Sequence, residues 1–373
     1  MDPLAYLTEH LAELEREGLR RSPAEPIAPG ALSFCSNDYL GLASTAAPPA
    51  PSGSGASRLI AGEREEHRRL ERALATWLGV EDALVFSSGY AANVGALSCL
   101  AGPSDLIVSD ALNHASIIDG ARLSRARVAV VPHGSTDAIA RALGDRAEAR
   151  AWVAVESYYS MDADGPDLAA LRRLCDAHGA GLFVDEAHAL GVLGPGGRGR
   201  AASAAVVPDV VVGTLGKALG GQGAFVGGRA VLRDYLWNRA RSFVFSTGLA
   251  PVSCAAALRS LQRVIEEPGL AATVEALSSR LRAGLDAAIA GRPDLTLQGE
   301  GHIVPLIVGA PDRAMRLATL LRERGVAVQA IRPPTVPQGT ARVRMTVTAL
   351  HTAADIDAAI AAVGAAIDVL DAR

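Results

Sequence analysis

From about Glu65 onward, the chain alternates short apolar runs with segments of helical pattern. The apolar runs lie at 83–86, 106–108, 128–131, 152–155, 181–184 and 210–212. Strands that are separated by helices need crossover connections, and such connections build a mostly parallel sheet with helices on both faces. The alternation therefore predicts an α/β fold with a mostly parallel central sheet.

The pattern changes near Pro268 and Gly269. Beyond these residues, the sequence indicates a long helix at 270–289, a strand at 303–308, a helix around 313–323, and two strand candidates through Met345 and Val347. A length of 373 residues also exceeds the usual range of one domain. We expect an N-terminal helix and strand segment at 1–45, a large α/β domain at 46–265 and a small α+β domain at 266–373.

The composition argues against a nucleic-acid, membrane or metal partner. The net charge is -4, and arginines are interleaved with acids instead of gathered on a basic face, so we expect no nucleic-acid binding. No apolar run approaches eighteen residues, which argues against a membrane span, and the first residues do not resemble a secretion signal. The four cysteines lie far apart, without metal-ligand spacing. These features predict a cytoplasmic protein without a bound metal.

Reactive side chains follow two of the apolar runs. Lys217 closes the segment 214–217 after one run, and Asp185 and His188 lie in 183–188 at the end of another. In open α/β sheets, ligands bind outside the carboxyl ends of the strands. Pyridoxal phosphate needs a lysine for a Schiff base and an acid that keeps its ring nitrogen protonated. The sequence therefore predicts a pyridoxal phosphate pocket at this edge.

Each of these residues also has an ordinary structural interpretation when it is taken alone. Lys217 fits an exposed glycine-rich turn, the turn at 86–93 fits a simple helix cap, His114 fits a loop histidine, and Ser160 fits a turn hydroxyl. In the functional interpretation, the helix start at 86–93 binds a phosphate and His114 stacks on the cofactor ring. Their occurrence together, in order along the chain, favours the functional interpretation.

The segment 185–188 also resembles the acidic box of nucleotide-driven helicases. A phosphate-binding loop needs a glycine five residues before the second glycine, and a serine or threonine after the lysine. Here those positions hold Val211 and Ala218, and Lys217 follows the acidic segment instead of preceding it. The helicase interpretation therefore fails.

The chain resembles the α-oxoamine synthase family, pyridoxal phosphate enzymes that join an amino acid to an acyl thioester with loss of carbon dioxide. The resemblance runs from about Leu32 to His351, and its motifs lie at 36–42, 88–93, 114–116, 160–162, 184–188, 214–217 and 334–337. It implies the fold of a type I pyridoxal phosphate transferase and a homodimer with its active site at the subunit boundary. Between Leu42 and Gly53 the chain is shorter than the family pattern, which has a helix there.

The resemblance also implies roles for individual residues. Lys217 would bind the cofactor covalently, Asp185 would pair with the ring nitrogen, His188 would bond the ring hydroxyl, and His114 would stack on the ring. The remaining implied contacts are Gly89, Tyr90 and Thr214 at the phosphate end, Ser160 near the ring oxygen, Arg344 on the amino-acid carboxylate, and Arg20, or its neighbour Arg21, on the far end of the acyl chain.

Segment 330–337 resembles the branch of the family that condenses L-alanine with a pimeloyl thioester in biotin synthesis. The acyl donor is then pimeloyl-CoA or pimeloyl-acyl carrier protein, since both present the same thioester arm. Two alternatives stay open at this point. One is another member of the family, such as glycine C-acetyltransferase or 5-aminolevulinate synthase, and the other is a non-catalytic protein of this fold that binds a partner.

Overall fold

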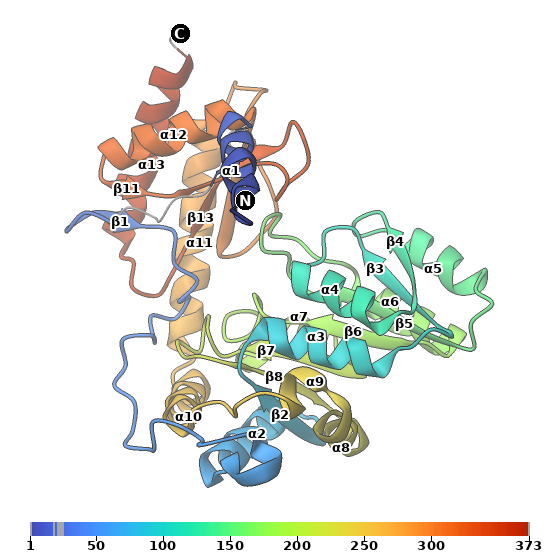
Figure 1. Ribbon diagram of the computed structural model, residues 1–373. Coiled ribbons are helices and arrows are strands. Elements are labelled where there is room, and N and C mark those ends of the chain that lie inside the picture. Colours follow the sequence, from blue (N-terminus) through green and yellow to red (C-terminus); the bar gives the residue numbers. More distant parts are fainter. Residues whose placement is uncertain (1, 18, 21–25, 372–373) are drawn as a thin grey trace.

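A computed structural model describes residues 2–17, 19–20 and 26–371 of the chain. Its larger sheet has seven strands in the order β2-β8-β7-β6-β5-β3-β4 (Figure 1). Every strand of this sheet runs in the same direction except β8, which is antiparallel to both of its neighbours. The strands are β2 (Asp82–Phe86), β3 (Asp105–Asp110), β4 (Arg127–Val131), β5 (Arg150–Glu156), β6 (Gly181–Asp185), β7 (Val210–Thr214) and β8 (Ala224–Gly228).

Helices cover both faces of this sheet, which explains why its strands read as unbroken apolar runs. Alternate residues of one strand point to opposite faces: Ile107 packs in the core beneath α3 and α4, whereas Leu106 and Val108 pack in the core beneath α5 and α6. The helical elements are η1 (Arg58–Gly62), α2 (Glu65–Leu78), α3 (Gly89–Leu100), α4 (Ala115–Ser124), α5 (Thr136–Gly144), α6 (Leu168–His178), η2 (Pro195–Gly197), α7 (Gly199–Ser203), α8 (Ala230–Arg239), α9 (Arg241–Val244) and α10 (Pro251–Glu266).

The smaller, C-terminal unit contains a four-stranded sheet in the order β12-β13-β10-β9, packed against three helices (Figure 1). A separate two-stranded pairing joins β1, from the N-terminal segment, in parallel with β11. The elements are α1 (Tyr6–Arg16), β1 (Leu32–Ser33), α11 (Gly269–Ala288), β9 (Thr296–Leu297), β10 (Ile303–Gly309), α12 (Pro311–Glu323), β11 (Val326–Ala327), β12 (Gln329–Ile331), β13 (Ala341–Thr346) and α13 (Ala353–Asp371).

The predicted fold class is confirmed, and each of the six apolar runs forms a strand of the larger sheet. One strand of that sheet, β8, was not predicted. Its sequence, Ala-Phe-Val-Gly-Gly, is rich in small residues and follows another glycine-rich stretch, so it resembles a turn. Among the described residues, none of the helices combines the length and the apolar character that crossing a lipid bilayer requires.

Candidate active site

The carboxyl ends of the central strands lie side by side at one edge of the larger sheet. Glu156 at the end of β5 is paired with Asp185 at the end of β6, and Asp185 is paired with Val212 of β7. Phe86 and Thr214, which end β2 and β7, are both paired with Ala224 of β8. The turn before α3 and the lysine turn after β7 therefore start from the same edge as the acids.

A chain of hydrogen bonds connects Asp185 with His114. Asn93 Nδ2 donates to Asp185 Oδ2 at 2.7 Å and to Ser116 Oγ at 2.9 Å. Ser116 Oγ lies 2.7 Å from His114 Nδ1, which also accepts from the Ser116 amide. The Ala187 amide donates to the other oxygen of Asp185 at 2.8 Å. Both side chains are thus held in fixed orientations before any ligand binds.

Lys217 lies in the turn that joins β7 to the antiparallel strand β8. The Gly220 amide donates to the Lys217 carbonyl, and Gly221 donates to Leu215, so the turn is closed on both sides of the lysine. Gly220 has φ +57°, and a Cβ there would lie 2.4 Å from the backbone nitrogen of Ala43. Only glycine permits this close approach, which fixes the lysine turn against the segment that ends at Ala43.

The amine of Lys217 is half-buried, and no hydrogen bond or ion pair joins it to any other described residue. Burial lowers its pKa from 10.5 to about 8, and the attraction of Asp185 and Glu156 only partly opposes this effect. Near neutral pH, a larger fraction of this lysine than of an ordinary lysine is therefore neutral and nucleophilic.

His188 is held from behind by Tyr39, a buried residue of the N-terminal segment. The Tyr39 hydroxyl lies 2.6 Å from His188 Nδ1. Burial raises the pKa of Tyr39, so the hydroxyl keeps its proton and can donate it to Nδ1 in the tautomer that carries its hydrogen on Nε2. Burial also lowers the pKa of His188 well below its usual value, and the Lys217 charge acts in the same direction. The neutral ring is then left with Nε2–H as a donor.

Arg344 reaches the site from β13 of the smaller unit and is 3% exposed. Its Nε donates to the Ser160 carbonyl at 2.7 Å, and its Nη2 donates to Asn37 Oδ1 at 3.1 Å. Ser160 therefore contacts Arg344 through its backbone, whereas the sequence suggested a role for its hydroxyl. The positive charge of Arg344 also contributes to the lowered pKa of Lys217.

The three residues predicted at the phosphate end surround the beginning of α3. The Ser88 side chain accepts from the Ala91 amide and caps the helix, while the space around Gly89 is open. Thr214 Oγ1 lies 3.2 Å from the Gly216 amide. Tyr90 is half-exposed, and its hydroxyl donates to Asp119 Oδ2 at 2.7 Å, so its side chain leans toward α4. The first amides of α3 have no partner inside the helix, as at every helix start.

Arg20 has no contact with Lys217, Asp185, His188, His114 or Arg344 among the described residues. Its guanidinium is exposed and pairs with Glu15 of α1 at 2.6 Å. Arg21, its alternative, lies outside the described residues. The structure thus brings together Lys217, Asp185, His188, His114 and Arg344, and it leaves Arg20 on the surface.

Several residues of this cluster were not predicted to have a role, although most lie inside the motifs. Tyr39 and Asn37 belong to the motif at 36–42, and Asn93 ends the motif at 88–93. A further signal in the composition went unused: Lys217 is the single lysine of the chain, whose other long basic side chains are all arginine. A cofactor that binds covalently to a side-chain amine can therefore bind only at Lys217.

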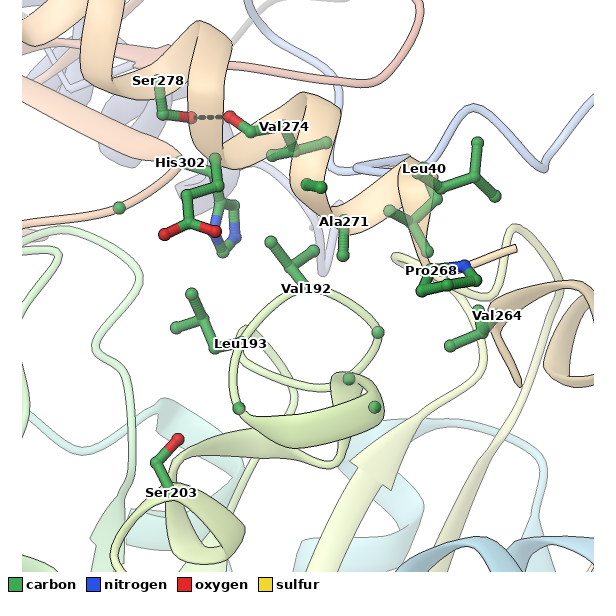
Figure 2. A pocket seen from close by; sticks show the side chains of 18 of the residues that line it. Leu40, Val192, Leu193, Ser203, Val264, Pro268, Ala271, Val274, Ser278 and His302 are labelled. Atoms are coloured by element: carbon green, nitrogen blue, oxygen red, sulfur yellow. Dashed lines mark hydrogen bonds between the residues drawn. The ribbon is translucent and has the colours of Figure 1, made fainter. Parts of the chain in front are cut away.

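A separate cavity of about 690 Å³ lies behind this cluster (Figure 2). Figure 2 shows Val192 and Leu193 on its lower wall, Ala271 and Val274 of α11 on its upper wall, and His302 at its side. The His302 ring contacts the Tyr39 ring at 4.3 Å between centroids. His302 lines the cavity and contacts Tyr39, which contacts His188 in turn, whereas neither His188 nor Lys217 lines the cavity.

Comparisons with known proteins agree with this geometry. The sequence matches the family described as aminotransferase class I and II over residues 29–363, so the chain belongs to that family. The protein named 8-amino-7-oxononanoate synthase of Anaeromyxobacter dehalogenans strain 2CP-1 is 45% identical, over 97% of this chain and 95% of its own length. The protein of the same name from Mycobacterium sp. strain JLS is also 45% identical, over 96% of this chain and 95% of its own. The solved structure of Sphingomonas wittichii serine palmitoyltransferase has a TM-score of 0.90 and 30% identity, with all of both chains covered.

Proposed function

We propose that this chain condenses L-alanine with a pimeloyl thioester to give 8-amino-7-oxononanoate, carbon dioxide and a free thiol, in biotin synthesis. The observation that carries the proposal is that the single lysine of the chain follows β7 at the sheet edge where the neighbouring strand β6 ends at Asp185, and that burial and the charge of this lysine both lower the pKa of His188 and His114. Relatives that are 42–45% identical over nearly the whole chain carry the name of this activity. The serine palmitoyltransferase structure is similar in fold but only 30% identical.

The residues at this edge fit pyridoxal phosphate. The amine of Lys217 would bind the aldehyde of the cofactor, and the Asp185 carboxylate would accept a hydrogen bond from its protonated ring nitrogen. His188 would donate Nε2–H to the ring hydroxyl, and His114 would cover one face of the ring. The open helix start at Gly89 and Tyr90, together with Thr214, would hold the phosphate.

The bound cofactor supplies an electron sink for a negative charge on the α-carbon of the substrate. The chain's own residues then have distinct tasks. Arg344 binds the carboxylate of L-alanine and orients the bond that breaks. The Lys217 amine, with its lowered pKa, removes the α-proton and later returns a proton to the same carbon. Asp185 keeps a proton at the ring nitrogen throughout.

The acyl donor is pimeloyl-CoA or pimeloyl-acyl carrier protein, and Arg20 or Arg21 would meet the far end of its chain. The test is product analysis by mass spectrometry. Two reactions contain L-alanine, one with pimeloyl-CoA and one with pimeloyl-acyl carrier protein. Parallel reactions contain glycine with acetyl-CoA, glycine with succinyl-CoA, and L-serine with palmitoyl-CoA. We expect the product only with L-alanine and a pimeloyl donor. If one of these parallel substrate pairs reacts faster than L-alanine with a pimeloyl donor, the chain catalyses a different reaction of the family.

The lowered pKa of Lys217 predicts the pH dependence of cofactor attachment. Only the neutral amine attacks an aldehyde, so the rate of attachment to cofactor-free protein should rise with pH, reach half of its maximum at a pH of about 8 and level off about one pH unit higher. An ordinary lysine, with a pKa of about 10.4, would give a rate that still rises at pH 9. Rapid-mixing absorbance measures this rate. Arg344→Gln should move the midpoint upward, because the Arg344 charge helps to lower the pKa of Lys217. A wild-type midpoint near 10 would contradict the assignment.

The protein would act as a homodimer with the active site at the subunit boundary. Large apolar side chains are uncovered in one area: Ile60 is 83% exposed and Phe245 is 72% exposed, and a hydrogen bond from Ser57 to the Val244 carbonyl joins their two segments. Such side chains are what a subunit interface buries.

Sedimentation velocity should therefore give a dimer for the wild type and a larger monomer fraction for Phe245→Asp. Val207→Asp is the matched control, because Val207 is 68% exposed but precedes β7 at the opposite edge of the sheet. A Phe245→Asp protein that stays as dimeric as this control would place the interface elsewhere.

A further inference from the structure

A histidine outside the catalytic cluster bridges two carboxylates from neighbouring loops. His133 follows β4, and its Nδ1 lies 2.9 Å from Asp110 Oδ1 at the end of β3. Its Nε2 lies 3.1 and 3.2 Å from the two oxygens of Asp164, in the loop after β5. Ionised carboxylates only accept hydrogen bonds, so both ring nitrogens carry hydrogen and the ring is a cation. Burial lowers the pKa of His133, but the bonds to Asp110 and Asp164 outweigh it and raise the pKa to about 10.

The Asp110 end of this bridge determines the path of the loop that carries His114. Asp110 Oδ1 also accepts from the Leu112 amide, and its Oδ2 accepts from the Gly134 amide, both at 2.8 Å. Asn113, next to His114, donates to the Ala154 carbonyl at 2.8 Å. The backbone from Asp110 to His114 is thus tied to the ends of β4 and β5.

The Asp164 end holds the loop that contacts Arg344. The Tyr159 amide donates to the Asp164 carbonyl at 2.8 Å, and the Ala163 amide donates to the Tyr159 carbonyl at 2.9 Å, which closes the loop on itself. Ser160 lies inside this closed loop, and its carbonyl accepts from Arg344 Nε. The Tyr159 ring also stands edge-on to the His133 ring, with 4.5 Å between centroids.

We propose that His133 is a positioning residue that fixes the spacing between His114 and Arg344, and thereby the width of the space that receives the amino-acid substrate. The inference rests on the proposed function, which assigns the L-alanine carboxylate to Arg344. None of the three bridge residues belongs to the group that would hold pyridoxal phosphate. The bridge should therefore affect the affinity for the amino acid more than the affinity for the cofactor, which Lys217 and Asp185 would hold from outside the two bridged loops.

The test is His133→Gln, which keeps a side chain of similar reach but removes the charge and one of the two donors. We expect the KM for L-alanine to rise about tenfold, because a small misplacement of a binding group has effects of that order or more. The dissociation constant of pyridoxal phosphate should rise by a smaller factor than the KM, because Lys217 and Asp185 would still hold the cofactor. In cofactor-free protein, amide hydrogen exchange should become faster in segments 110–116 and 157–165. His133→Arg, which restores a cation with several donors, should recover part of the KM.

The matched control is Arg127→Gln at the other end of β4, where Arg127 donates two hydrogen bonds to Glu148. This variant should leave the KM and the exchange of both segments unchanged. A His133→Gln protein with a lower Tm but an unchanged KM would show a purely structural role and overturn the proposal. If His133→Gln does not fold, Asp164→Asn weakens the same bridge from its other end and should give the same KM effect. A wild type that binds the cofactor but does not turn over L-alanine contradicts the proposed function, and the exchange measurement still decides whether the bridge holds the two loops.

Discussion

Lys217→Ala should abolish the visible absorbance of bound cofactor and lower the condensation rate by at least about 10³-fold, because the variant loses both the amine that binds the cofactor and the base. Most proteins have other lysines that can bind pyridoxal phosphate nonspecifically and hide such a result. This chain has no second lysine, so covalent attachment of the cofactor to a side chain depends on Lys217 alone. Absorbance spectra after dialysis and a product assay measure the two effects.

The composition allows a sharper version of this experiment. Borohydride reduction of the wild type with bound cofactor should modify a single internal peptide, the one that contains Lys217, and peptide mapping identifies it. The N-terminal amine is the only other primary amine of the chain, and it serves as the internal reference for nonspecific reaction. Lys217→Ala should show no internal modification. A wild type labelled only at its N-terminus would contradict the assignment of the cofactor to this lysine.

Asp185→Asn should reduce the condensation rate by about 10²- to 10³-fold, because the amide has the same shape but no longer carries the negative charge that holds a proton on the ring nitrogen. The substitution also changes one local hydrogen bond. Asn93 and the Ala187 amide donate to the two oxygens of Asp185, so an asparagine keeps one of these bonds and loses the other. We expect cofactor to bind, with a changed visible spectrum, and steady-state kinetics measure the loss of rate.

Asp105→Asn is the matched control for Asp185→Asn. Asp105 is also a buried carboxylate of the same sheet, 1% exposed, but it begins β3 at the opposite edge and pairs with Arg150 at 2.9 Å. Loss of this pair should lower the Tm and leave the spectrum and the rate unchanged. Equal losses of rate in the two variants would mean that Asp185 acts through stability, without a specific role at the ring nitrogen.

Much of the fold could be predicted because its signals are local. A strand that is buried on both faces shows a short unbroken apolar run, and β3 and β6 contain such runs at 106–108 and 182–184. Asp185 and Thr214 could be assigned to a site because they end such strands, and the ends of parallel strands meet at one edge. The glycine-rich β8 lacks this signal, so its antiparallel position between β2 and β7 was not predicted.

The sequence by itself determined the α/β class, the edge at which ligands bind and the reactive residues there, since the period of a strand and the residue at its end are properties of neighbours along the chain. Only the tertiary structure decided which distant groups complete the site. Arg344 meets Asn37 across 307 positions, and Tyr39 reaches His188 across 149. No local pattern records such contacts, because they depend on how the smaller unit and the N-terminal segment pack against the sheet edge.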